Sequence, residues 1–366
     1  MLIALLALCA AVANFVQPEA RTQPRADQRA ILESMQLAGP DVVWLLLRNP
    51  FDDSGELVDT SNAGATWRSL PLPAGVASEL LGFELIDARD VVLRLKHGLA
   101  VTHDGGTSWR AMALPAGLES GQGAYFLDQR HGWYLASGAP DLAERPASMW
   151  ATADAGAHWS LLWSVSSLRP VDGGIPLDGE KRLLGFRTPM EGWMDVIGLG
   201  RSVLLSTLDG GATWSVAPIP ENAPAVGVHF FPPRTVLVTL DEPLDSAVIR
   251  SDDAGVSWDA ARRDPPFPAS AESRPVPAMG DPLMWFVPAG RQILETLDGG
   301  TTWHTAPARL PSGLRIQDLV WLPASGRGYG VARDRLDNPY LVSTTDWGRD
   351  WSDISAPELS RAPVAP

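Results

Sequence analysis

The sequence predicts an all-β protein made of seven repeated units, and three observations support this prediction. An eight-residue motif, [Ser/Thr]-x-[Asp/Asn]-x-Gly-x-x-Trp, occurs seven times in the 366 residues. Its closing tryptophans recur every 42 to 55 residues, a period typical of repeat folds. Each interval contains short strand-like segments and none with a helical period. Four antiparallel strands per interval are typical of a propeller blade, so we expect a seven-bladed β-propeller of four-stranded antiparallel blades with seven motif turns.

The motif itself predicts a tight turn between two strands. Its glycine is expected at positive φ, where a Cβ would clash. The Asp or Asn side chain can accept hydrogen bonds from N–H groups of its own turn, and the Trp can pack its indole under the hairpin. We therefore predict structural roles for Asn62, Asp104, Asp154, Asp209, Asp253, Asp298 and Asp346, and for Trp67, Trp109, Trp159, Trp214, Trp258, Trp303 and Trp351.

Residues 180–219 illustrate how one repeat supplies four strands. The strand-like segments are 183–189, 190–198, 201–207 and 213–219. The motif lies between the third and the fourth segment, and the other repeats follow the same order. The propeller is therefore predicted to cover residues 35–356. Two modes of closure remain open, either blade against blade or through an outer strand from residues 14–34.

The repeats resemble those of the Asp-box propellers, also called bacterial neuraminidase repeat or sialidase-type propellers. The order Phe126, Asp128, Gly132 and Trp133, followed by the motif at 152–159, is most similar to photosystem II assembly or stability factors. This resemblance implies the fold, and it implies a non-catalytic scaffold that docks on or stabilises an envelope complex. The motifs depart from the family at three positions, which are Asn62, His158 and Asp350.

The two ends of the chain are predicted to lie outside the propeller. Residues 1–13 are apolar, end in a small-x-small site and are interpreted as a signal peptide. Residues 14–34 are read as a polar linker, and residues 357–366 as a flexible tail. Export to the periplasm or the extracellular space would follow, with no membrane span after removal of the leader. Lipidation of Cys9, the only cysteine, stays open.

Charge and composition exclude several classes of function. The net charge of −14 disfavours nucleic acid and anionic membrane surfaces as partners. Removal of the leader would also remove Cys9, and with it any thiolate chemistry. The six histidines lack the spacing of metal ligands, so we expect neither a metal site nor a cofactor. We expect a monomer.

Candidate binding residues lie on the long loops between the second and third strands, because long loops on a rigid scaffold commonly carry function. These loops occupy the face opposite the motif turns. The candidates are Asp52, Asp53, Asp141, Glu144, Asp241, Glu242, Asp245, Arg333 and Arg335. A surface charged in this way favours a basic or mixed-charge protein partner.

The leading interpretation is an exported, non-catalytic propeller that binds a protein, so no catalytic residue is assigned. The alternative is a carbohydrate-active propeller, a glycoside hydrolase or sialidase-like enzyme, or a glycan-binding protein. Two loop carboxylates at a suitable separation would suffice for glycoside hydrolysis. A sialidase would also need an Arg-Ile-Pro segment before the motifs, and the sequence has none.

Overall fold

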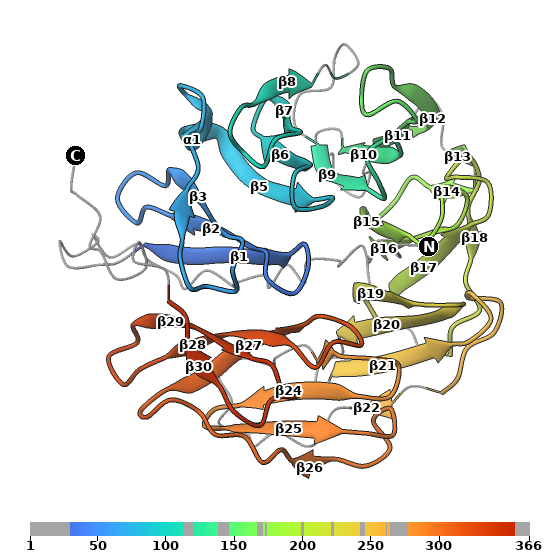
Figure 1. Ribbon diagram of the computed structural model, residues 1–366. Coiled ribbons are helices and arrows are strands. Elements are labelled where there is room, and N and C mark those ends of the chain that lie inside the picture. Colours follow the sequence, from blue (N-terminus) through green and yellow to red (C-terminus); the bar gives the residue numbers. More distant parts are fainter. Residues whose placement is uncertain are drawn as a thin grey trace. The chain divides into compact units, whose positions relative to one another are not determined.

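The computed structural model describes residues 30–112, 114, 121–137, 146–166, 171–172, 174–198, 201–220, 223–241, 246–260, 262–263 and 277–355. These residues form seven four-stranded antiparallel sheets, each with its strands in chain order (Figure 1). The predicted fold class, an all-β seven-bladed propeller, is confirmed. Among the described residues the only helix is α1 (Val76–Glu79). No helix there is long and apolar enough to cross a membrane.

The described residues divide into two compact units, one spanning Arg89–Arg263 and the other combining the residues before and after that range.

The strands of blades one and two are β1 (Ile31–Leu37), β2 (Val43–Arg48), β3 (Gly55–Thr60), β4 (Arg68–Ser69), β5 (Leu80–Leu85), β6 (Val91–Leu95), β7 (Gly98–Thr102) and β8 (Arg110–Met112). Strand β1 begins at Ile31, four residues before the predicted start of the propeller at residue 35.

Blades three to five follow along the chain. Their strands are β9 (Gly121–Phe126), β10 (Gly132–Ser137), β11 (Ala147–Thr152), β12 (Ser160–Val165), β15 (Glu180–Phe186), β16 (Gly192–Gly198), β17 (Arg201–Thr207), β18 (Ser215–Val216), β19 (Ala225–Phe231), β20 (Thr235–Asp241), β21 (Ser246–Ser251) and β22 (Arg262–Arg263). A small hairpin, β13 (Val171–Asp172) and β14 (Ile175–Pro176), lies in the connection between blades three and four.

Blades six and seven complete the seven sheets. Their strands are β23 (Ala278–Met279), β24 (Trp285–Ala289), β25 (Gln292–Thr296), β26 (His304–Thr305), β27 (Arg315–Trp321), β28 (Gly328–Arg333), β29 (Pro339–Thr344) and β30 (Ser352–Asp353). All four strands of blade seven are consecutive in the chain, as are those of blade one.

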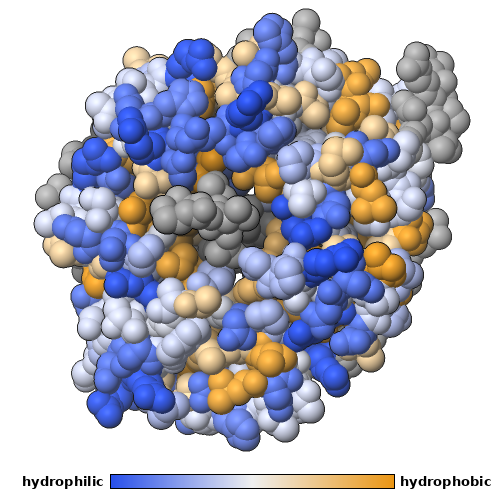
Figure 2. All heavy atoms as spheres, turned by 45° about the vertical axis from the view of Figure 1, so that its right-hand side comes forward, coloured by the Kyte–Doolittle hydropathy of each residue, from blue (hydrophilic) through white to orange (hydrophobic). Residues whose placement is uncertain are grey.

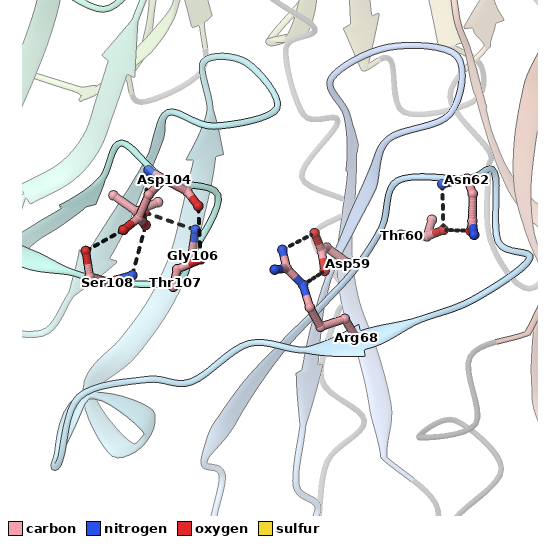
Figure 3. A network of polar contacts seen from close by, with 9 residues as sticks. Asp59, Thr60, Asn62, Arg68, Asp104, Gly106, Thr107 and Ser108 are labelled. Atoms are coloured by element: carbon pink, nitrogen blue, oxygen red, sulfur yellow. Dashed lines mark hydrogen bonds and ion pairs between the residues drawn. The ribbon is translucent and has the colours of Figure 1, made fainter.

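Each motif forms the turn between the third and fourth strands of its blade. In blade two, Thr102 Oγ1 donates to Asp104 Oδ1 at 2.7 Å and accepts the N–H of Gly106 at 3.0 Å. Asp104 in turn accepts the N–H and the hydroxyl of Ser108 (Figure 3). Asn62 occupies the Asp position in blade one and accepts a hydrogen bond from Thr60 (Figure 3). The carboxylate therefore satisfies backbone donors that the turn leaves unpaired.

A second contact recurs in all seven blades. The residue after the motif Asp or Asn donates its N–H to a carbonyl in the turn between the first and second strands of the same blade. The pairs are Ala63 with Asp41, Gly105 with Arg89, Ala155 with Arg130, Gly210 with Met190, Ala254 with Arg234, Gly299 with Leu283, and Trp347 with Gly326. Both turns of each blade therefore lie on one face, the motif face, and the loops between the second and third strands lie at the other end.

The glycine that opens the second strand of several blades has a packing role. Gly132, Gly192 and Gly328 lie opposite Phe126, Phe186 and Trp321 of the neighbouring first strand. A Cβ at Gly132 would come within 2.5 Å of the Phe126 ring, and one at Gly192 within 2.6 Å of Phe186. The aromatic ring covers the bare backbone of the glycine, a known way of stabilising glycine in a sheet.

Aromatic side chains also join adjacent blades. Trp133 of blade three stacks on Phe186 of blade four with ring centroids 3.6 Å apart and planes at 4°. Phe286 of blade six stacks on Trp321 of blade seven at 3.9 Å and 8°. Trp133 also donates its indole N–H to Gly210 O in the motif of blade four at 2.8 Å. The buried aromatic rings of these residues therefore form their contacts between neighbouring blades and not only within one sheet.

Blade seven packs directly against blade one. Tyr329 of β28 donates its hydroxyl to Pro40 O at 2.6 Å, and Arg327 forms an ion pair with Asp41 at 3.2 Å. Trp67 donates its indole N–H to Ile354 O at 2.8 Å. Since each of these blades also has four consecutive strands of its own, the contact is blade against blade, one of the two modes that the sequence left open.

Four motif glycines, Gly64, Gly156, Gly211 and Gly255, lie against side chains of the adjacent blade, and Gly156 tests the strength of this contact. Its φ is +79°, and a Cβ would lie 2.4 Å from Met112 Sδ of blade two. Gly313 is a matched control, because its φ is +86° and nothing lies within 4 Å. Gly313→Ala should cost about 1–2 kcal/mol of unfolding free energy through backbone strain alone. Gly156→Ala should cost at least about 1 kcal/mol more, because Met112 must move.

Urea unfolding of the two variants measures this difference. Equal losses of unfolding free energy would show that Met112 can make room for a Cβ at Gly156 without cost, which contradicts a tightly packed joint between blades two and three.

Candidate functional site

The candidate site comprises the loops between the second and third strands of blades one and seven, residues 49–54 and 334–338. On the motif face these two blades are joined through Arg327 and Asp41, in their turns between the first and second strands. Strands β2 and β28 each run six residues away from that face, about 20 Å. Both loops therefore lie on the same side of the joined blades, opposite the motif turns.

Both loops begin with the same local structure, a turn held by an Asn or Asp side chain. Asn49 Oδ1 accepts the N–H of Phe51 at 2.9 Å, and Asp334 Oδ1 accepts the N–H of Leu336 at 2.8 Å. Such turns form because a short polar side chain can replace a backbone acceptor two residues away. Phe51 and Leu336 are therefore equivalent residues of the two loops.

An arginine at the end of the second strand closes each loop. Arg48 Nη1 donates to Asp53 O at 3.1 Å, and Arg333 Nη1 donates to Asp337 O at 2.8 Å. Both aspartates have positive φ, 62° and 66°, a conformation that Asp tolerates better than most residues. The arginine that ends the strand thus stabilises the aspartate of strained backbone conformation through a hydrogen bond to its carbonyl oxygen.

The same two arginines reach back to the first strand of their blades. Arg48 forms an ion pair with Glu33, and the Nε of Arg333 donates to Gln317 Oε1. Glu33 and Gln317 are the extra residues of bulges in β1 and β27. A bulge commonly re-aims a side chain, and here it turns both residues toward the arginine.

The carboxylates of the site are largely engaged in the loops themselves. Asp334 accepts hydrogen bonds from Asn338 Nδ2 at 2.8 Å and from the N–H groups of Leu336 and Asn338, and these lower its pKa. Asp52 accepts the Ser54 hydroxyl at 2.7 Å and the Ser54 N–H at 3.0 Å, which lowers the pKa of Asp52. Asp337 forms ion pairs with Arg315 and Arg333.

The structure places the predicted binding residues unequally. Asp52 and Asp53 lie in the blade-one loop, whereas Arg335 lies in the blade-seven loop and Arg333 ends β28 beside it. Asp241 ends β20 and is exposed. Four predicted residues lie outside the described part of the chain, namely Asp141, Glu144, Glu242 and Asp245.

Sequence reasoning selected the charged residues of these loops and missed Phe51 and Leu336. The available signal is local: an Asn or Asp two residues before an apolar residue, followed by an Asp that ends the loop, in Asn-Pro-Phe-Asp-Asp and Asp-Arg-Leu-Asp. This pattern predicts an Asx turn whose bonded N–H belongs to the apolar residue. Composition alone draws attention to the acids instead.

Outside the loops, burial raises the pKa of three described carboxylates, Asp195, Glu295 and Asp318, and Asp195 is the most buried of them by exposed surface. Asp195 of β16 has no exposed surface and lies between blades four and five. Burial raises its pKa to about 6, although the Ser202 hydroxyl at 2.6 Å and the Ala225 N–H at 3.2 Å favour the ionised form. Ala225 begins β19, so Asp195 ties blade four to blade five.

Among the described residues, no group of three or more His, Cys, Asp or Glu side chains is arranged to hold a metal ion. Three histidines of blades two and three instead pair singly with carboxylates: His103 with Asp90, His131 with Asp128, and His158 with Asp154. Figure 2 shows hydrophobic residues in small groups scattered among hydrophilic ones on the face in view.

Comparison with known proteins adds information on the fold. No protein-family model matches the chain, and no curated protein matches it either. A solved structure of YCF48 bound to D1 peptide is similar with a TM-score of 0.56 and 14% identity, over 89% of this chain and 95% of that chain. YCF48 from Cyanidioschyzon merolae gives 0.56 and 13%, over 89% and 98%. A prolyl endopeptidase gives 0.60 and 13%, over 89% of this chain and 49% of that chain.

At these identities the likeness is one of fold. The two YCF48 structures are matched over nearly their whole length, whereas about half of the prolyl endopeptidase chain has no counterpart here. The fold is therefore one that occurs both alone and as part of larger chains.

We predict that Asp334→Ala loosens the blade-seven loop without unfolding the protein. The N–H groups of Leu336 and Asn338 would lose their acceptor and exchange with solvent faster. Hydrogen exchange measured by NMR or mass spectrometry checks this, with Asp350→Ala, an exposed aspartate of the same blade, as the control. Unchanged exchange at Leu336 in Asp334→Ala would show that the turn does not depend on Asp334.

We predict that Asp195 makes stability fall as pH rises from about 4 to 6. Its native pKa of about 6 lies above the unfolded value of about 3.9, so the native state binds more protons in that window. The loss could reach about 3 kcal/mol of unfolding free energy, and it is complete above pH 6.

Urea unfolding between pH 4 and 7 measures this slope. Asp195→Asn should flatten it, whereas Asp259→Asn, which removes an exposed aspartate of the same unit, should leave it unchanged. An unaltered slope in Asp195→Asn would contradict the assignment to Asp195.

Proposed function

We propose that this protein is an exported, non-catalytic β-propeller that binds another protein and serves as a scaffold or assembly factor for an envelope complex. The observation that carries the proposal is the likeness to YCF48, matched over 95% of its length in a structure with a bound D1 peptide. A propeller of the same extent can therefore hold a peptide without a further domain. The motif resemblance to assembly or stability factors points the same way.

The geometry of the candidate site fits a binding role. Asp52, Asp334 and Asp337 are held by hydrogen bonds and ion pairs at the loops, which lowers the pKa of Asp52 and Asp334. A general acid near neutral pH needs the opposite shift. Each loop carries an apolar residue on a backbone fixed by its own hydrogen bonds, Leu336 exposed and Phe51 partly exposed, an arrangement suited to contact with a protein surface.

Affinity purification of the tagged full chain, after mild cross-linking of the cells that naturally produce it, tests this proposal. We expect one protein to be recovered in near-equal amounts with the chain, and sequencing of the mature N-terminus to show that a leader has been removed. An unrelated exported propeller with the same tag is the control bait.

The enzyme alternative is tested in parallel with the purified chain and polymeric or sialylated glycans. We expect no release of reducing sugar or sialic acid above the background without protein. Release that Asp52→Asn abolishes would overturn the proposal in favour of a glycoside hydrolase.

A further inference from the structure

Leu336 is the most exposed large apolar side chain of the described residues, with 83% of its surface accessible. A single exposed leucine needs no explanation in a soluble protein. Here, however, the equivalent residue of the adjacent blade is also apolar, since Phe51 occupies the same place in the blade-one loop and remains partly exposed. Two loops of the same construction on adjacent blades therefore each carry an apolar residue, which is exposed in blade seven and partly exposed in blade one.

Both residues are held in place before any partner arrives. The Asx turns fix the N–H groups of Phe51 and Leu336, and Arg48 and Arg333 fix the carbonyl groups that follow. A loop fixed in this way loses little conformational entropy on binding, so more of the contact energy appears as affinity. Rigid loops also favour one geometry of contact over others.

The loop of blade one carries net negative charge. The charges of Arg48 and Glu33 cancel in their ion pair, which leaves Asp52 and Asp53 and a net charge of −2. Asp53 is exposed and holds no cation among the described ion pairs. This side of the pair of loops therefore attracts a basic group.

The loop of blade seven carries net positive charge. Arg315, Arg333 and Arg335 oppose Asp334 and Asp337, which leaves a net charge of +1. Arg315 and Arg333 are paired with Asp337, so Arg335, which is exposed beside Leu336, is the cation most accessible to a partner. The two loops therefore carry net charges of opposite sign.

We propose that Phe51 and Leu336 form a two-point docking surface for a protein segment that carries opposite charges at its two ends. The segment would cover both side chains with its own apolar residues, with a basic residue facing Asp52 and Asp53 and an acidic residue facing Arg335. The proposal rests on the proposed protein-binding function and adds where the partner docks, what chemistry it has and which way it runs. Reversing the segment would place like charges against each other at both ends, which costs affinity.

A library of random twelve-residue peptides displayed on phage is the probe, selected on the immobilised full chain. We expect enriched peptides to carry an apolar centre with basic residues toward one end and acidic residues toward the other. Synthetic copies of the best peptides should bind Phe51→Ser and Leu336→Ser at least about tenfold more weakly than the unmodified chain. Arg335→Glu should weaken binding further than Arg335→Gln, and higher salt should reduce these charge effects.

The matched control is Leu208→Ser, which removes an equally prominent leucine, 74% exposed, from a motif turn of blade four. It should bind the peptides as the unmodified chain does. Arg335, Leu336 and Leu208 are exposed, and thermal melting should show their variants within about 2 °C of the parent. Phe51 is only partly exposed, so peptide binding to Phe51→Ser is measured below its melting transition, after circular dichroism has shown it to be folded.

Two outcomes would overturn the proposal, and they are distinguishable. If peptides bind and the serine variants bind them equally well, protein binding stands and the docking surface lies elsewhere. If neither the peptide library nor affinity purification yields a binder, the proposed function fails, and the docking surface fails with it.

Discussion

The structure depends on a turn in which two consecutive residues have left-handed backbone conformations. In each motif the glycine and the residue before it both have positive φ, from Ala63 and Gly64 to Trp347 and Gly348. Such a turn leaves several N–H groups without partners, and the motif Ser or Thr, the Asp and a carbonyl of the neighbouring turn accept them. In four motifs the same glycine also provides the space into which a side chain of the adjacent blade packs, so there one turn determines both the hairpin and its joint.

The sequence predicts this fold well because the motif is local. Eight residues specify the turn, the spacing specifies the repeat, and the φ of each motif glycine, between 79° and 93°, follows from the need to avoid a Cβ. The partners of the motif are not local and could not be predicted. Nothing in the sequence relates Gly156 to Met112 or Trp67 to Ile354. Trp347 at a left-handed position also differs from the Gly or Ala of other motifs, and its indole lies against Trp321.

The position of the candidate site could be predicted from the sequence, but the kind of side chain that remains there for contact with a partner could not. Loop length and charge located Asp52, Asp53, Arg333 and Arg335 on the face opposite the motifs. Their charges, however, are partly used within the loops, because an exposed turn needs acceptors for its own N–H groups before it can offer any to a partner. The apolar residues of the same turns, Leu336 and the partly exposed Phe51, then remain as further contact sites. An interpretation of the sequence from charge alone overlooks such residues. Their availability depends on which polar side chains form hydrogen bonds within the turn.

The contact between blades seven and one has a consequence for the order of folding. Each motif hairpin closes between residues at most a few positions apart, which is fast and can occur as soon as a blade has been synthesised. The hydrogen bond from Trp67 to Ile354 joins residues 287 positions apart, so it can form only when the last blade exists. Until then, the surface of blade one that will receive blade seven stays uncovered. A growing chain would therefore expose one unfinished seam for almost its whole synthesis, and chaperones that recognise apolar surface would have a defined place and period in which to act.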